Sequence, residues 1–106
     1  MEQTQITYRV EGQTLWIILP KELDHHSSRF LKENTEQILK EHYIRRIIFD
    51  FSRTDFMDST GIGVLMGRYK RMKECGGQVQ VYGVNERIGR ILKISGIYKI
   101  ISPAEK

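Results

Sequence analysis

The sequence contains a single cysteine, Cys75, which excludes a disulfide within the chain and is typical of a reducing compartment. No stretch approaches the roughly 20 apolar residues that a membrane-spanning helix needs. The first residues, Met1–Gln5, have neither the basic start nor the apolar run of a secretory signal peptide. We therefore expect a cytoplasmic protein that has no membrane partner.

Only two residues are proline, and no tract of low complexity or linker-like composition interrupts the chain. Its 106 residues lie close to the commonest size of a single domain. Charged residues make up 28% and apolar residues 40%, a balance that is typical of soluble globular proteins and not of disordered ones. We expect residues 1–106 to form one domain.

Motifs for cofactors, metals and nucleophilic catalysis are missing. The pair Gly61 and Gly63 lacks the third glycine of a dinucleotide-binding loop, and no Gly-x4-Gly-Lys phosphate loop occurs. The three histidines do not fall at the spacing of zinc ligands. Ser59 lacks the flanking glycines of an acyl-transfer serine, and no histidine follows it in the chain. We expect no cofactor, no metal and no enzymatic activity.

One enzymatic alternative stays open. Three acidic residues, Asp50, Asp55 and Asp58, follow a strand-like segment, where a nucleophilic aspartate of a small phosphotransferase could lie. Ser52 stands where the second acid of an Asp-x-Asp pair would be. A small aspartate-dependent phosphotransferase is therefore the less favoured reading.

The net charge of +4 is modest, and its densest basic run is Arg68–Lys73. Cations toward the C-terminus of a helix are favoured by the helix dipole, and basic runs commonly form a solvated helix face. We therefore expect no nucleic-acid partner and keep a basic nucleic-acid-binding domain as an alternative.

The hydrophobic pattern predicts an α/β fold. Four strands, three helices and a final strand are expected, in this order: strands 5–10 and 14–19, helix 25–41, strand 44–51, helix 60–74, strand 78–82, helix 86–95 and strand 98–101. The first two strands form a hairpin around residues 11–13. Alternating helices and strands after a hairpin predict a mixed β-sheet, with an N-terminal hairpin and a parallel portion, covered by helices.

Several residues predict how the helices begin, end and pack. Asp24 and Asn85 are suited to cap the first and third helices, and Gly76-Gly77 is suited to end the second. Four apolar residues of the first helix form an expected inward stripe: Phe30, Leu31, Ile38 and Leu39. In the second helix we expect Gly67 to allow close packing, and leave Gly63 open between packing and an exposed backbone.

The most informative segment is Asp58-Ser59-Thr60-Gly61-Ile62-Gly63, where a strand gives way to the second helix. Hydroxyls there lie beside the free N–H groups of a helix start. On chemistry alone, Ser59 or Thr60 is most simply an N-cap. The alternative is a modification site, because an added phosphate would change the surface charge without rebuilding the core.

Several motifs together resemble the bacterial anti-sigma-factor antagonists of the STAS domain family, and most of all its sporulation branch. They are Glu22-Leu23-Asp24-His25-His26, Phe56-Met57 with the segment that follows, Gly67-Arg68-Tyr69-Lys70, Cys75-Gly76-Gly77 and Ser95-Gly96-Ile97 with Lys99-Ile100-Ile101. The family fold is a mixed sheet with helices packed on it. The family usually continues into a C-terminal helix, whereas this sequence ends at Ser102–Lys106, so we expect that helix to be absent or trimmed here.

The resemblance implies a switch by partner exchange. The unphosphorylated protein would bind an anti-sigma factor that is also a serine kinase, with ATP or ADP bound, and so release the sigma factor. That kinase would phosphorylate Ser59 and end binding, and a phosphatase of the PP2C type would restore it. The partner-binding residues implied are Asp24, His25, Asp58, Ser59, Thr60, Gly61, Ile62, Gly63 and Arg68. For Arg68 the alternatives are a contact at the rim of the interface or a solvated side chain.

Overall fold

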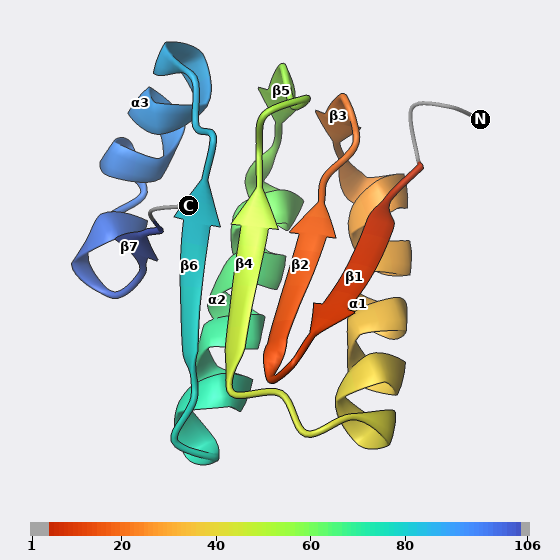
Figure 1. The fold of residues 1–106 in the computed structure, drawn as a ribbon. Helices are drawn as coiled ribbons and strands as arrows, with labels where there is room; N and C mark the ends of the chain where they lie inside the picture. Colours follow the sequence, from red (N-terminus) through yellow and green to blue (C-terminus); the bar gives the residue numbers. More distant parts are fainter. Residues whose placement is uncertain (1–4, 105–106) are drawn as a thin grey trace.

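The computed structural model describes residues 5–104 and contains a five-stranded sheet with helices behind it (Figure 1). The sheet has the order β1 (Thr7–Glu11), β2 (Thr14–Ile18), β4 (Arg46–Asp50), β6 (Gln78–Tyr82) and β7 (Ser102–Pro103). A second sheet joins β3 (Glu22–Leu23) to β5 (Phe56–Met57). The helices are α1 (His25–Glu41), α2 (Ser59–Glu74), α3 (Glu86–Ile94) and the short 3-10 helix η2 (Ile97–Lys99).

Strand pairing confirms the predicted α/β class. Strands β1 and β2 form an antiparallel hairpin, whose turn contains Gly12 at a φ of 62°, and every other pairing is parallel. A mixed sheet with an N-terminal hairpin and a parallel portion is therefore the observed arrangement.

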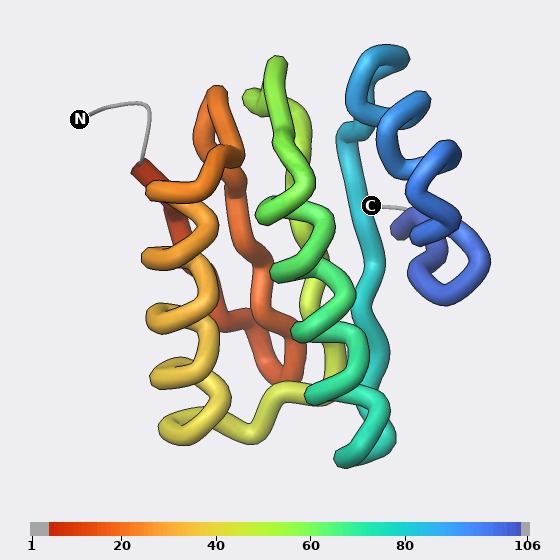
Figure 2. Tube along the Cα trace, turned by 180° about the vertical axis from the view of Figure 1, so that it is seen from behind, coloured from red at the N-terminus to blue at the C-terminus, as the bar shows by residue number. Residues whose placement is uncertain are grey.

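Helices α1 and α2 lie side by side on one face of the sheet, with α3 beside β6 (Figures 1 and 2). Six alternating residues of the central strands join the core between sheet and helices: Leu15, Ile17, Ile47, Phe49, Val79 and Val81. They meet Leu31 of α1 and Leu65 of α2, both fully buried. Every second residue of each central strand thus forms one side of the core, and residues of the helices form the other side. No helix within residues 5–104 is both long and apolar enough to cross a bilayer.

The predicted inward stripe of α1 is wrong at Phe30. That side chain is 43% exposed, whereas Ser27, Ser28 and Thr35 are buried. The hydroxyl of Thr35 donates to the carbonyl oxygen of Leu31 at 2.8 Å, so its burial leaves no unpaired donor. Hydrophobic periodicity does not count serine and threonine as buried residues. A helix can nevertheless bury them, because their hydroxyls can donate to its own backbone carbonyls.

The final strand is also displaced from its predicted position at 98–101. Residues 97–99 form η2, which begins after Gly96 at a φ of 81°, and β7 follows at Ser102–Pro103. Ile97 and Ile101 are both fully buried. Their spacing of four residues fits a helical turn, which explains why a strand was the wrong interpretation.

Arg68 is neither solvated nor an open rim contact, because it is 7% exposed and lies between the two helices. Its Nη1 donates to Oε1 of Glu36 on α1 at 2.5 Å, and Nε of Arg71 lies 3.5 Å from Oε2 of the same carboxylate. Glu36 therefore ties α2 to α1 through two cations. Burying Arg68 is tolerated only while that carboxylate is present.

We expect Glu36→Leu to reduce the free energy of unfolding by about 2–4 kcal/mol, because it leaves the charge of Arg68 buried without its partner. Arg68→Met should lose about 1 kcal/mol or less, because the Glu36 side chain is 38% exposed and stays hydrated. Urea unfolding of both variants measures the difference. Glu33→Leu, at an exposed position of the same helix, is the control; equal losses in the Glu36 and Arg68 variants would contradict this account.

The same pair predicts a pH dependence. The hydrogen bond from Arg68 holds the pKa of Glu36 below its ordinary value of 4.5, against the opposing effect of burial. The folded pKa lies below the unfolded one, so this stabilisation is complete above about pH 5 and is lost as the pH falls through the folded value. Unfolding measured between pH 7 and 3 should show a shallower acid loss in Glu36→Gln than in the unmodified chain. An identical pH profile in the two would refute the assignment.

Candidate functional site

The small sheet of β3 and β5 places the starts of α1 and α2 next to each other. The two strands pair in parallel, with Leu23 opposite Met57. The backbone N–H of Asp58 donates to the carbonyl oxygen of Leu23 at 3.2 Å. The residues that follow each strand, Asp24 and Asp58, are therefore neighbours across this pairing, and each caps the helix that follows.

At the start of α1, Asp24 forms a reciprocal capping box with Ser27. Oδ1 of Asp24 accepts hydrogen bonds from the backbone N–H and the hydroxyl of Ser27, at 3.0 and 3.1 Å. The hydroxyl oxygen of Ser27 in turn accepts from the backbone N–H of Asp24 at 3.0 Å. The hydrogen bond from the Ser27 backbone lowers the pKa of Asp24, so its carboxylate stays charged at neutral pH.

At the start of α2 the cap is Asp58, so the reading of Ser59 or Thr60 as the N-cap is wrong. Oδ1 of Asp58 accepts from the backbone N–H groups of Thr60 and Gly61, at 2.9 and 3.4 Å. It also accepts a hydrogen bond from the hydroxyl of Thr60. Ser59 is the first residue of the helix.

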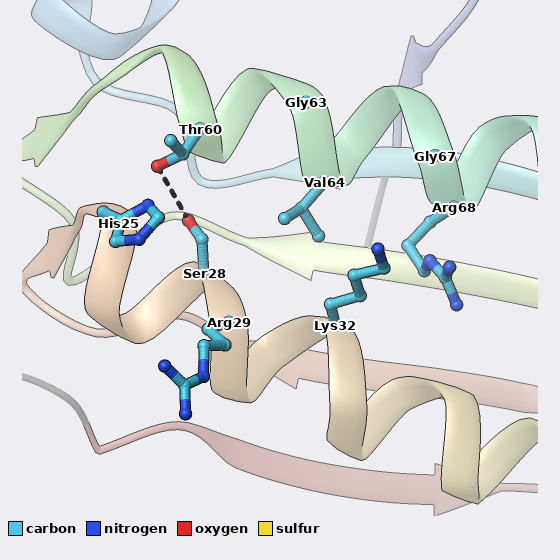
Figure 3. A pocket seen from close by; sticks show the side chains of 9 residues that line it. All are labelled: His25, Ser28, Arg29, Lys32, Thr60, Gly63, Val64, Gly67 and Arg68. Carbon is cyan, nitrogen blue, oxygen red and sulfur yellow. Dashed lines mark hydrogen bonds between the residues drawn. The ribbon is translucent and has the colours of Figure 1, made fainter.

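Four hydroxyls gather at these two helix starts, and three of them are engaged. Ser27 is fully buried in its capping box, and Ser28 is 3% exposed. The hydroxyls of Thr60 and Ser28 form a hydrogen bond of 3.4 Å across the helices (Figure 3). The hydroxyl of Ser59 is exposed and has no hydrogen-bond partner among the described residues. It is the one hydroxyl of the four that faces solvent freely.

A groove of about 380 Å³ runs between α1 and α2, directly beside these hydroxyls (Figure 3). Its lining residues are His25, Ser28, Arg29, Lys32, Thr60, Gly63, Val64, Gly67 and Arg68. We call it the α1/α2 groove. Three cationic side chains line it, and two of them are already paired with carboxylates: Arg68 with Glu36 and Arg29 with Glu33. The groove therefore carries little unpaired positive charge.

The glycines of α2 have two different roles. A Cβ atom at Gly61 would lie 2.6 Å from Cγ of Met57 and 3.0 Å from Cδ2 of Leu23, so Gly61 is required for packing against the small sheet. At Gly63 and Gly67 a Cβ atom would meet nothing within 4 Å. The expectation that Gly67 serves close packing is therefore wrong. Both residues lower the wall of the groove and leave backbone open to solvent.

The structure brings most of the predicted site residues together. Asp24, Asp58 and Ser59 lie at the paired helix starts, and His25, Thr60, Gly63 and Arg68 line the groove. Ser59 and Gly63 are four residues apart and share a helix face, which places the free hydroxyl beside the groove. Ile62 is half-buried and packs against the core.

Sequence reasoning missed the contribution of α1 to the groove. Four of its lining residues, His25, Ser28, Arg29 and Lys32, recur at spacings of three and four and so lie on one helix face. The sequence shows that these residues share one face of a helix. It does not show that this face lies beside α2, because that arrangement depends on the pairing of β3 with β5.

The other candidate acids do not gather with Asp58. Oδ1 of Asp50 accepts from the backbone N–H of Ser52 at 2.9 Å, and Asp55 forms an exposed ion pair with Lys21 at 4.0 Å. Across residues 5–104, no three His, Cys, Asp or Glu side chains are grouped as a metal site would require.

Comparisons of fold identify similar solved structures. The unphosphorylated form of the anti-sigma factor antagonist SpoIIAA superposes with a TM-score of 0.86 at 23% identity, over 96% of this chain and 90% of that one. The phosphorylated form of the Bacillus cell fate determinant SpoIIAA gives a TM-score of 0.77 at 24% identity, over 96% of this chain and 93% of that one. These likenesses show that the fold is shared.

Comparisons of sequence give closer relatives. An anti-sigma F factor antagonist from Paenibacillus polymyxa is 36% identical over 97 residues, which are 92% of this chain and 83% of the relative. An anti-sigma-B factor antagonist from Bacillus subtilis (strain 168) is 32% identical over 85 residues, 80% of this chain and 76% of the relative. Residues 5–106 match the STAS domain, so the chain belongs to the STAS domain family.

Proposed function

We propose that this protein is an anti-sigma-factor antagonist controlled by phosphorylation of Ser59. Unphosphorylated, it binds an anti-sigma factor that is also a serine kinase carrying ATP or ADP, and so frees the sigma factor. Phosphorylation of Ser59 by that kinase ends binding, and a PP2C-type phosphatase restores it. The observation that carries the proposal is the exposed hydroxyl of Ser59 at a helix start, which has no hydrogen-bond partner within residues 5–104. The names of the sequence relatives support the class of partner.

The proposed partner surface is centred on the two helix starts and extends into the α1/α2 groove. It comprises Asp24, His25, Asp58, Ser59, Thr60, Gly61, Ile62, Gly63 and Arg68. Two of these act from within the protein: Gly61 lets α2 approach the small sheet, and Arg68 holds α2 to α1 through Glu36. The open backbone at Gly63 and Gly67 allows a partner chain to approach α2 closely.

Phosphate on Ser59 acts through charge and bulk. It adds about −1.5 to −2 charges, which the N-terminus of α2 tolerates. Asp58, beside it, and Asp24, across the β3–β5 pairing, are already negative. A partner that places an acidic group near Ser59, or that fits closely against it, then meets added repulsion or a steric clash. One charge pair at ~5 Å in an effective dielectric of ~20 amounts to about 3 kcal/mol, or roughly a hundredfold in affinity.

A local change of this kind requires no refolding. Solved structures of SpoIIAA in its unphosphorylated and phosphorylated forms both match the fold of this chain. That similarity supports a switch in which the fold persists and the surface changes.

We propose, further, that the chain works as a single cytoplasmic domain, without catalysis, cofactor, nucleic acid or membrane. Two cations of the basic run, Arg68 and Arg71, are bound to Glu36 and do not form an open basic face. One oxygen of Asp58 is occupied by three hydrogen bonds at the helix start, which suits a capping role more than a nucleophilic one.

Ser59 variants test the proposal directly. With the partner kinase and ATP, Ser59→Ala should bind the kinase but accept no phosphate, because the exposed hydroxyl is gone. Ser59→Asp should bind about a hundredfold more weakly, because it adds a charge at the same place. Calorimetry measures binding, and mass mapping locates the phosphate. Stoichiometric phosphorylation of the Ala variant, or undiminished binding by the Asp variant, would overturn the assignment.

The groove is tested by filling it. Gly67→Leu should keep or raise the free energy of unfolding by up to about 1 kcal/mol, because the position is open and leucine favours helix. It should weaken kinase binding at least about tenfold, because the side chain fills part of the α1/α2 groove. Lys73→Leu, an exposed change on the same helix outside the groove, is the matched control. Equal affinities of the two variants would remove the groove from the partner surface.

A further inference from the structure

Two adjacent hydroxyls, those of Ser59 and Thr60, stand at the start of α2, and they are chemically similar acceptors. In either case a bond would form between Oγ and the γ-phosphorus of a nucleoside triphosphate. The bond from that phosphorus to the β,γ-bridging oxygen would break, leaving the diphosphate, and the hydroxyl proton would pass to a base. Similar chemistry at neighbouring positions means that something in the protein must select one of them.

The structure holds Thr60 in one orientation. Its hydroxyl donates to Oδ1 of Asp58 and is hydrogen-bonded to the hydroxyl of Ser28, which is 3% exposed. Figure 3 shows the Thr60 side chain directed at Ser28, toward α1. Side chains settle in a small number of staggered rotamers, and two hydrogen bonds on one oxygen fix which rotamer is occupied. Turning this hydroxyl outward, toward a phosphoryl donor, would break both bonds.

Within residues 5–104, Ser59, unlike Thr60, is not held by hydrogen bonds from its side chain. Its side chain is exposed, and its hydroxyl has no partner among the described residues. Oδ1 of Asp58 is already taken by Thr60 and by the N–H groups at the helix start. The carboxylate that caps α2 therefore also holds back one of the two hydroxyls and leaves the other free.

We propose that Asp58 selects the phosphoacceptor by hydrogen-bonding the hydroxyl of Thr60, so that the kinase acts on Ser59 alone. This inference rests on the proposed function and adds a role for Asp58 beyond capping and partner contact. Asp58 is a positioning residue here, because it orients the hydroxyl of Thr60 and takes no part in the transfer. Ser28 is the weaker support, since its contact with Thr60 is 3.4 Å.

The test compares the sites of phosphorylation within single variants. Asp58→Ala should raise the share of phosphate on Thr60 at least about tenfold over the unmodified chain, as expected when a hydrogen bond to a charged group is lost. Asp58→Asn keeps an oxygen that can accept from Thr60 and should leave phosphate on Ser59. Ser28→Ala, which spares the bond to Asp58, should do the same. Because both sites are read from one chain by mass mapping, weaker kinase binding changes the yield and not the ratio.

Phosphate confined to Ser59 in Asp58→Ala would overturn the inference and leave the proposed function standing. If the kinase phosphorylates none of the variants, the hydrogen bond between Thr60 and Asp58 can still be tested by NMR without the kinase. The hydroxyl proton of Thr60 should exchange slowly enough for detection by NMR in the unmodified chain and in Asp58→Asn, and be lost in Asp58→Ala. Absence of that resonance from the unmodified chain would refute the hydrogen-bonded state of Thr60, whatever the kinase does.

Discussion

The pairing of β3 with β5 is the contact on which the site depends. It consists of two residues on each side, yet it determines where two long helices begin. Because Leu23 and Met57 are opposite each other and buried, Asp24 and Asp58 follow at the same level and both helices start at one edge of the molecule. Gly61 belongs to the same unit, since any side chain there would collide with Met57 and Leu23. Without this pairing α1 and α2 could still pack on the sheet, but their first turns would have no fixed relation.

Two opposed electrostatic effects meet at this edge. The N-terminal ends of α1 and α2 carry unpaired N–H groups and positive partial charge, which favour an anion. The carboxylates of Asp24 and Asp58 already supply that anion, and hydrogen bonding holds Asp24 in its charged form. An added phosphate is therefore compatible with the helix but adds to existing negative charge. Phosphorylation at such a site would leave the fold in place and change mainly the surface charge. A switch that acts through the protein surface needs this combination.

Sequence patterns predicted the parts of the fold in which one physical signal dominates. The hairpin, the parallel strands, both caps at Asp24 and Asn85 and the left-handed Gly76 all follow from local preferences. The failures lie where tertiary contacts override those preferences. Phe30 is apolar but faces solvent, Arg68 is charged but buried, and β3 and β5 are too short to show a periodicity. The groove was missed for the same reason, since its two walls come from helices whose relation only the small sheet determines.

The glycines of α2 lower the stability of the helix, and two of them leave its backbone accessible at the surface. Each glycine within a helix costs about 1 kcal/mol relative to alanine. At Gly61 the cost is offset by packing that no larger residue permits, whereas Gly63 and Gly67 have open space beside them and gain nothing within the fold. They lie on the side of α2 that lines the α1/α2 groove. The proposed function gives this cost a purpose, because an open backbone at these two positions would let another chain approach α2 closely.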